Sequence, residues 1–312
     1  MSAGGDGREQ PGVGGASGPG TPVEFCGLRL AHRVINGSGT FDAIAARRVF
    51  GGALAREFPF AAYVSKTITL EQRAGNPPPR LWEAAGGMIN SIGLPNKGLD
   101  GYLAEDLPPL AELLAEAGAD GAPVPLITNV MGSTGEELAR LVAACEQRTE
   151  IAAIELNVSC PNVKTGLDIG ADPRQLEQVV RDCREHTRKP LIVKLTPNTA
   201  DVPACAQAAE AAGADAVSLI NTLRATALAP GGEPWLGGGS GGLSGPAIRV
   251  VALAQVAAVA RSVSIPVIGM GGVQRAAHAQ DLIDAGAGLV AVGSESFRDP
   301  AVAGKIAREL AS

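Results

Sequence analysis

Short apolar runs alternate with Ala-rich segments of helical period from about residue 30 to the end of the chain. Each run is apolar almost throughout, which is typical of strands in a parallel sheet that is covered on both faces. The eight strands that this pattern predicts span residues 33–38, 60–66, 125–131, 151–159, 190–196, 214–221, 265–271 and 288–294.

The segments between these runs carry apolar residues three and four positions apart, which predicts amphipathic helices. The clearest is 172–186, where Asp172 is the expected N-cap and Pro173 takes the first helical position. Further helices are predicted over residues 106–118, 135–147, 199–213, 245–262 and 274–286.

Eight successive strand–helix units predict an α/β fold, a (β/α)8 TIM barrel. A doubly wound open sheet is the alternative, because it uses the same alternation. Residues 67–124, 160–172 and 222–245 are longer than usual βα loops, and all three follow strands. We therefore expect them to lie as insertions over the C-terminal face, where barrels place their active sites.

Composition agrees with one globular domain over residues 21–312, preceded by a Gly/Pro-rich tail over 1–20 that we expect to be disordered. Aromatic residues are only 3 %, so Val, Ile, Leu and Ala must build the core. The net charge of −6 argues against a nucleic-acid partner. No apolar run approaches the roughly 18 residues of a membrane span, and the N-terminus has no secretory pattern.

The five cysteines are an odd number without close pairs, which fits reduced thiols in the cytoplasm and excludes CxxC spacing for an iron–sulfur cluster on this chain. No cluster of His and carboxylate residues indicates a metal. Cys145, Cys183 and Cys205 follow helical apolar stripes and are expected to be buried. Cys160 lies between Ser and Pro just beyond the fourth strand, where a thiol of lowered pKa can act as a general base.

Polar or Gly-rich residues stand at nearly every predicted strand end. Gly271 and Gly272 follow the seventh strand, and Gly293 and Ser294 follow the eighth, which is the recurrent phosphate position of this architecture. The alternative is that these glycines only make tight turns.

Lys66 and Lys194 both close apolar strands, where a lysine is costly to bury unless an anion pairs with it. An anionic ligand would satisfy both lysines, whereas a salt bridge to Glu155 is the alternative for one of them. Neutral amides at strand ends and in long loops suit a flat heterocycle, since they both donate and accept hydrogen bonds, although Asn also makes turns. These amides are Asn90, Asn129, Asn157, Asn162 and Asn221.

The motifs together resemble those of dihydroorotate dehydrogenases. The similarity runs from about residue 22 to residue 310, in the order of the family. Its most specific segments are NSIGLPN at 90–96 and NVSCPNVK at 157–164. The resemblance implies a (β/α)8 barrel that holds one FMN and oxidises (S)-dihydroorotate to orotate in de novo pyrimidine biosynthesis.

The resemblance also implies a role for each matching residue. Cys160 would remove the C5 proton of dihydroorotate while the C6 hydride passes to FMN. The residues expected to hold the substrate are Lys66, Asn90, Ile92, Gly93, Leu94, Asn157, Asn162, Asn221 and Thr222. Those expected to hold FMN are Ser38, Gly39, Lys66, Thr67, Asn129, Asn157, Lys194, Ile220, Gly245, Gly271, Gly272, Gly293 and Ser294.

A cysteine base and a polar N-terminus make the chain similar to class 1 members of the family. Within class 1, its motifs look closer to the NAD-linked heteromeric branch than to the fumarate branch. The resemblance implies a homodimer and, for that branch, a partner subunit that carries FAD and [2Fe–2S]. Two alternatives stay open, namely another FMN barrel that acts on a related dihydropyrimidine and a non-catalytic flavin-binding subunit.

Overall fold

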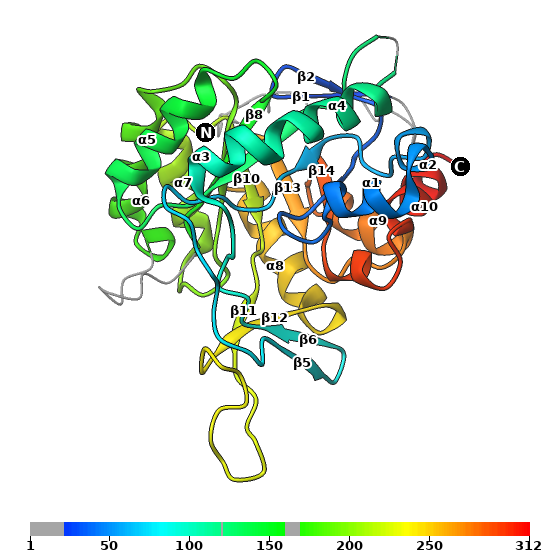
Figure 1. The fold of residues 1–312 in the computed structure, drawn as a ribbon. Coiled ribbons are helices and arrows are strands. Elements are labelled where there is room, and N and C mark those ends of the chain that lie inside the picture. The colour runs from blue at the N-terminus through cyan, green and yellow to red at the C-terminus, as the bar shows by residue number, and fades with distance from the viewer. Residues whose placement is uncertain (1–21, 120, 160–168) are drawn as a thin grey trace, which may run out of the picture.

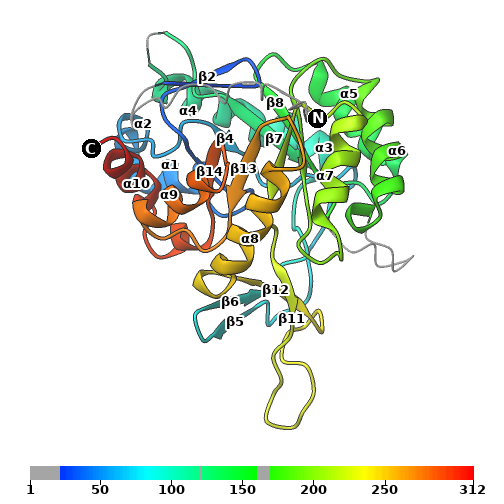
Figure 2. The same cartoon turned by 180° about the vertical axis from the view of Figure 1, so that it is seen from behind.

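Eight parallel strands form the centre of the computed structural model, which describes residues 22–119, 121–159 and 169–312. Helices surround the strands on the outside (Figures 1 and 2). In pairing order, the strands are β3 (Val34–Asn36), β14 (Leu289–Val292), β13 (Val267–Met270), β10 (Ala216–Leu219), β9 (Leu191–Lys194), β8 (Ala153–Asn157), β7 (Leu126–Val130) and β4 (Tyr63–Val64). Every predicted run contains one of these strands.

The gap between β3 and β4 is closed by one backbone bond and one side chain. The amide of Ala61 donates to the carbonyl of Val34 at 3.0 Å. The carboxamide of Asn36 then bonds both backbone groups of Val64, accepting from its N–H and donating to its carbonyl, each at 2.8 Å. The sheet is thereby nearly closed as a barrel, so the predicted (β/α)8 fold is confirmed and the open sheet is wrong.

The helices follow the strands as predicted. Asp172 caps its helix by accepting from the Arg174 amide at 2.9 Å, and Pro173 is the first helical residue. The helices are α1 (Ala43–Phe50), α2 (Gly52–Arg56), α3 (Gly98–Gly101), α4 (Leu107–Ala117), α5 (Gly135–Glu146), α6 (Pro173–Arg184), α7 (Val202–Ala211), α8 (Arg249–Ala260), α9 (Ala276–Asp284) and α10 (Val302–Leu310). Of these, α1, α2, α3 and α10 lie outside the predicted helical segments.

The core is aliphatic, as the shortage of aromatic residues requires. The barrel interior is filled by inward-facing side chains that include Ile35, Ile127, Ile192 and Ile268. A hairpin of β1 (Val23–Phe25) and β2 (Leu28–Leu30) packs Phe25 and Leu30 against them. It covers the end of the barrel away from the small sheet described next (Figure 1).

A four-stranded antiparallel sheet lies at the other end of the barrel (Figure 2). Its strands are β5 (Leu81–Ala84), β6 (Gly87–Asn90), β12 (Gly241–Ser244) and β11 (Leu223–Ala225). They come from the long stretches 67–124 and 222–245, whose strands the hydrophobic pattern does not predict. These strands are only three or four residues long, and three glycines stand within them. Neither a long apolar run nor a regular alternation of apolar and polar residues therefore marks them as strands.

No helix in the described part of the chain is long and apolar enough to cross a membrane. The expected tail at 1–20 lies outside the described residues, as do residues 160–168 of the long stretch 160–172.

Replacing Asn36 by Ala tests how the barrel is closed. The substitution leaves the N–H and carbonyl of Val64 buried without partners, at about 1–3 kcal/mol each. We expect Asn36→Ala to lower the free energy of unfolding by about 2–6 kcal/mol in urea denaturation. Gln207→Ala, which removes an exposed carboxamide from α7, is the control and should change it by less than about 0.5 kcal/mol. An Asn36→Ala chain as stable as the control would contradict this account.

Candidate active site

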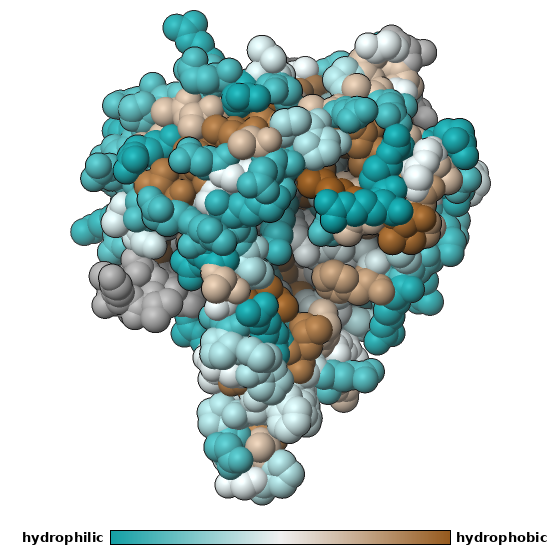
Figure 3. Space-filling view, in the orientation of Figure 1, coloured by the Kyte–Doolittle hydropathy of each residue, from teal (hydrophilic) through white to brown (hydrophobic). Residues whose placement is uncertain are grey.

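A cavity of about 710 Å³ lies between the C-terminal ends of the barrel strands and the small sheet. Its volume is within the range of cofactor and small-molecule sites. A smaller cavity of about 350 Å³ adjoins it and shares Leu81, Met88 and Phe297 with its wall. Apolar side chains gather on the surface where the small sheet meets the barrel (Figure 3). The insertions at 67–124 and 222–245 therefore lie where the barrel architecture predicts a site.

Most of the predicted site residues lie on the wall of this cavity, although they come from widely separated parts of the chain. The predicted residues on the wall are Ser38, Gly39, Lys66, Thr67, Asn90, Ile92, Gly93, Leu94, Asn157, Lys194, Ile220, Asn221, Thr222, Gly245, Gly271, Gly272, Gly293 and Ser294. Cys160 and Asn162 lie outside the described residues. Asn129 is fully buried and is not part of the wall.

Asn129 belongs to a polar network inside the barrel. Its Nδ2 donates to Glu155 Oε2, and Ser218 Oγ donates to Glu155 Oε1 at 2.7 Å. Both carboxylate oxygens of Glu155 are thereby bonded. The Oδ1 atom of Asn129 is buried and has no hydrogen-bond partner among the described residues. Asn129 is thus the one described member of the predicted set that would need a shift in the wall to contact a ligand.

Two lysines of the wall have no anionic partner within the described ranges. Lys194 closes β9 and is only 6 % exposed, whereas Lys66 follows β4 and is exposed. The alternative of a salt bridge to Glu155 is not what the structure shows, because Glu155 bonds to Asn129 and Ser218 instead. A nearly buried ammonium without a counter-charge is costly, so the cavity favours an acceptor or an anion beside Lys194.

A chain of hydrogen-bonded side chains follows the strand ends from β10 to β4. Asn221 Nδ2 donates to Ser159 Oγ at 3.0 Å, and Ser159 Oγ lies 3.1 Å from Asn157 Oδ1. Asn157 Nδ2 in turn donates to Thr67 Oγ1 at 3.4 Å. Ser159, which the sequence reasoning passed over beside Cys160, is the link that fixes the orientation of both amides.

The glycines after β13 are required by their surroundings. Gly271 has a φ of +132°, and a Cβ there would lie 2.6 Å from the Cβ of Ala252. Gly272 has a φ of +69°, and its Cβ would lie 2.7 Å from Arg249 Cβ. Gly293 differs, because the nearest atom to an added Cβ is Thr40 Cγ2 at 3.8 Å. Turn-making therefore explains the glycines after β13 but leaves Gly293 free for close approach to a ligand.

Two asparagines that sequence reasoning missed hold the loop over residues 92–98 in place. Asn96 accepts from the amide of Gly98 at 2.8 Å and donates to the carbonyl of Leu94 at 2.9 Å. Asn76 donates to Ser91 Oγ at 3.0 Å. Leu94 has a φ of +55°, an uncommon conformation for leucine that these bonds support. Asn96 is the second Asn of the NSIGLPN segment, whereas Asn76 stands in the segment GNPPPR at 75–80.

The other cysteines in the described part of the chain are poor candidates for a base. Burial raises the pKa of the Cys145 and Cys183 thiols to about 12, and burial together with the nearby Asp215 does the same for Cys26. Cys205 is buried as predicted. The thiols of Cys26, Cys145 and Cys183 stay protonated at neutral pH, so Cys160 remains the predicted base.

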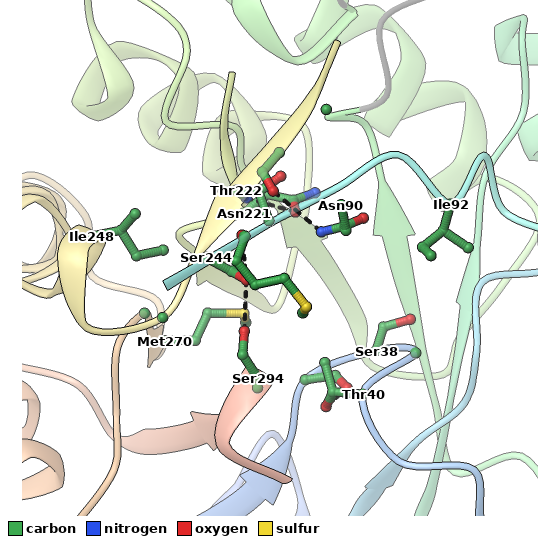
Figure 4. A pocket seen from close by; sticks show the side chains of 18 of the residues that line it. Ser38, Thr40, Asn90, Ile92, Asn221, Thr222, Ser244, Ile248, Met270 and Ser294 are labelled. Carbon is green, nitrogen blue, oxygen red and sulfur yellow. Dashed lines mark hydrogen bonds between the residues drawn. The ribbon is translucent and has the colours of Figure 1, made fainter. Parts of the chain in front are cut away.

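Serine hydroxyls join the small sheet to the turn after β14. Ser294 Oγ donates to Ser244 Oγ at 2.7 Å (Figure 4). Asn90, Asn221 and Thr222 gather at another part of the wall, where Asn90 Nδ2 donates to the Gly242 carbonyl at 3.3 Å (Figure 4). The cavity therefore has a glycine–serine end beside β13 and β14 and an amide end beside β10.

The family model described as dihydroorotate dehydrogenase matches residues 21–312. This chain belongs to the dihydroorotate dehydrogenase family. The resemblance predicted from its motifs is thereby confirmed.

Similar dihydroorotate dehydrogenases come from several bacteria. The chain is 44 % identical to a protein of Pelobacter propionicus over 94 % of this chain and 92 % of that protein. It is 43 % identical to proteins of Trichlorobacter lovleyi and Desulforudis audaxviator, over 94 % and 93 % of this chain and 92 % and 91 % of those proteins. All three are named dihydroorotate dehydrogenase B (NAD(+)), catalytic subunit, which agrees with the predicted class 1, NAD-linked branch.

The two kinds of glycine predict effects of different size on stability. Gly271→Ala combines an unfavourable φ with a clash, so we expect the free energy of unfolding to fall by about 2–4 kcal/mol. Gly293→Ala adds a methyl group to open space at a negative φ and should change stability by less than about 1 kcal/mol. Urea denaturation of both variants checks this, and equal losses in the two would refute the distinction.

Proposed function

We propose that this chain oxidises (S)-dihydroorotate to orotate, a step of pyrimidine biosynthesis, with FMN as its cofactor. The observation that carries the proposal is the cavity wall, which combines an anion-binding end with an arc of neutral amides. The family and the names of similar proteins agree with this assignment. A flat ring with imide groups and a carboxylate is the kind of ligand that such a wall accepts.

The residues present fit FMN. The turns of Gly271, Gly272 and Gly293 leave backbone N–H groups beside the cavity, where a phosphate is favoured. Lys194 lacks a counter-charge within the described residues and would stabilise negative charge on the flavin ring. When bound, FMN supplies the acceptor for the hydride.

The substrate is proposed to lie at the amide end. Asn90, Asn157 and Asn221 can donate to ring carbonyls and accept from ring N–H groups, because each carboxamide offers both functions. Lys66 stands across the barrel mouth from Asn221, since β4 and β10 are four places apart in the ring of eight strands. It would pair with the substrate carboxylate. The bonds of Ser159 hold Asn157 and Asn221 in place before the substrate arrives.

Cys160 is the proposed general base, which takes the proton from C5 of dihydroorotate. A thiolate is needed for this step, and the ammonium groups of the cavity favour the charged form of a nearby thiol. Cys160 directly follows Ser159 in the sequence, and the Ser159 hydroxyl bonds to Asn221 and Asn157 of the amide arc. This adjacency in the sequence supports the assignment of Cys160 as the base.

Electrons then leave the chain by a route that we propose from the names of the similar proteins. Their naming as NAD(+)-linked catalytic subunits supports a partner subunit carrying FAD and [2Fe–2S], with NAD rather than fumarate as the acceptor. Within the described ranges, no three His, Cys, Asp or Glu residues are grouped so that they could hold a metal ion. We further propose that two copies of the chain form a homodimer in the cytoplasm.

Anaerobic addition of dihydroorotate to the FMN-loaded chain tests the activity. We expect the flavin absorbance to bleach and one equivalent of orotate to form. A flavin that binds but is not reduced would favour one of the alternatives, a different dihydropyrimidine or a non-catalytic role.

Cys160→Ala tests the base. We expect this variant to bind FMN normally while its rate of reduction by dihydroorotate falls by about 10²–10⁴-fold, the usual contribution of general acid–base catalysis. Cys26→Ala is the matched control, because Cys26 lies in the turn of the β1–β2 hairpin, which covers the opposite end of the barrel. Full activity of Cys160→Ala at neutral pH would overturn the assignment.

Lys194→Ala tests the cofactor contact. Removing the ammonium should weaken FMN retention or slow flavin reduction by at least about tenfold, because a charge-assisted bond is worth about 1.5–3 kcal/mol. Flavin content after gel filtration and stopped-flow reduction measure the two effects. Retention and reduction both equal to those of the unsubstituted chain would reject this role of Lys194.

A further inference from the structure

Arg224 is a cation on the cavity wall that neither the motifs nor the proposed chemistry uses. It lies in β11 of the small sheet and is exposed. Its neighbours along the strand, Leu223 and Ala225, alternate with it and pack toward the apolar side of the sheet. Arg224 therefore stands on the opposite, cavity-facing side.

The strand register places Arg224 beside the substrate end of the cavity. Arg224 pairs with Gly242 of β12, and Gly242 pairs with Asn90 of β6. Residues directly opposite one another in antiparallel strands project from the same face, so Arg224 and Asn90 share a face, on either side of Gly242. A side chain at Gly242 would collide with Thr222 Oγ1. The Thr222 side chain therefore lies over Gly242, so this predicted substrate residue stands between Arg224 and Asn90 on the cavity-facing side.

The backbone of Arg224 is held in place by a loop that follows β9. Asn198 Oδ1 accepts from the Arg224 amide at 2.9 Å, and Asn198 Nδ2 donates to the Thr222 carbonyl at 3.0 Å. One asparagine thus fixes both Arg224 and Thr222, a predicted substrate residue. The backbone of Arg224 is therefore fixed at the rim by the same side chain that fixes a residue of the site.

The guanidinium has no carboxylate within 4 Å in the described part of the chain. Other arginines do have such partners, for example Arg184 with Asp215 and Arg249 with Asp281. The wall carries three cations, Lys66, Lys194 and Arg224, but among its described residues only one carboxylate, Glu295, which bonds to Gln274. The mouth therefore has a positive field in a protein of net negative charge.

The position of Arg224 along the small sheet shows which of the two anions expected in the cavity, the phosphate of FMN or the carboxylate of the substrate, lies nearer to it. Ser244 of β12, which bonds to Ser294, marks the phosphate end. Gly242, the partner of Arg224, lies two residues along the strand, about 6–7 Å toward Asn90. Arg224 is thus next to the substrate end and apart from the phosphate end.

We propose that Arg224 captures the carboxylate of the substrate at the rim of the cavity and selects carboxylated over uncharged dihydropyrimidines. This inference rests on the proposed function. An arginine at an exposed rim acts on encounter and binding, since it attracts the anion before the ring reaches the amides. The chemical step at the ring does not involve it.

Steady-state oxidation of dihydroorotate by the FMN-loaded chain, with a redox dye in excess as the electron acceptor, tests the proposal at about 10 mM and about 1 M KCl. The charge field extends over about 30 Å at the lower salt and about 3 Å at the higher. We expect Arg224→Gln to raise KM about tenfold at low salt while kcat stays within about twofold. At high salt the KM of Arg224→Gln should approach that of the unsubstituted chain, because the charge field is screened. Arg224→Lys keeps the positive charge, so its KM at low salt should lie close to that of the unsubstituted chain.

Arg188→Gln is the matched control, because Arg188 is exposed in the turn before β9 at the opposite end of the barrel. It changes the net charge equally and should leave KM unchanged. Flavin content and the unfolding midpoint verify that each variant is folded. An unchanged KM in Arg224→Gln, or a loss confined to kcat, would overturn the role of Arg224. Absence of dihydroorotate oxidation in the unsubstituted chain would instead overturn the proposed function, and this inference with it.

Discussion

The carboxamide of Asn36 closes the ring of strands on which the site depends. It replaces a backbone ladder by bonding both polar groups of Val64, and it does so entirely inside the protein. A closed parallel ring ends all of its strands on one rim. Residues as distant in sequence as Ser38 and Ser294 therefore face the same cavity (Figure 4). Without closure, the polar strand ends would be a row along a sheet and would not enclose a ligand.

Hydrophobic pattern was sufficient to predict the barrel because buried parallel strands are apolar on both faces. The runs at 190–196 and 265–271 each contain an observed strand, and Asp172 and Pro173 begin their helix where expected. The small sheet could not be predicted in this way. Its strands are short, half-exposed and interrupted by Gly87, Gly241 and Gly242, so they lack a clean alternation.

Some of the site residues could be predicted from the sequence and others could not, for similar reasons. Those that end barrel strands, such as Asn157 and Lys194, follow directly from the strand prediction, because the architecture determines where a strand end points. Depth along a strand is harder to judge: Asn129, predicted to hold FMN, is not part of the cavity wall but belongs to the network around Glu155, and its contact with FMN stays a prediction. Arg224 could not be found at all, since its orientation depends on pairing between two insertions.

The roof of the cavity joins two segments that are far apart in the chain. Asn90 and Gly242, hydrogen-bonded neighbours in the small sheet, are separated by 152 residues. Pairing at that distance carries a large loop-closure cost until most of the barrel between them is formed. The binding cavity is therefore completed late in folding, and a chain that has built only its first strands has the residues of the site but no enclosed space in which to use them.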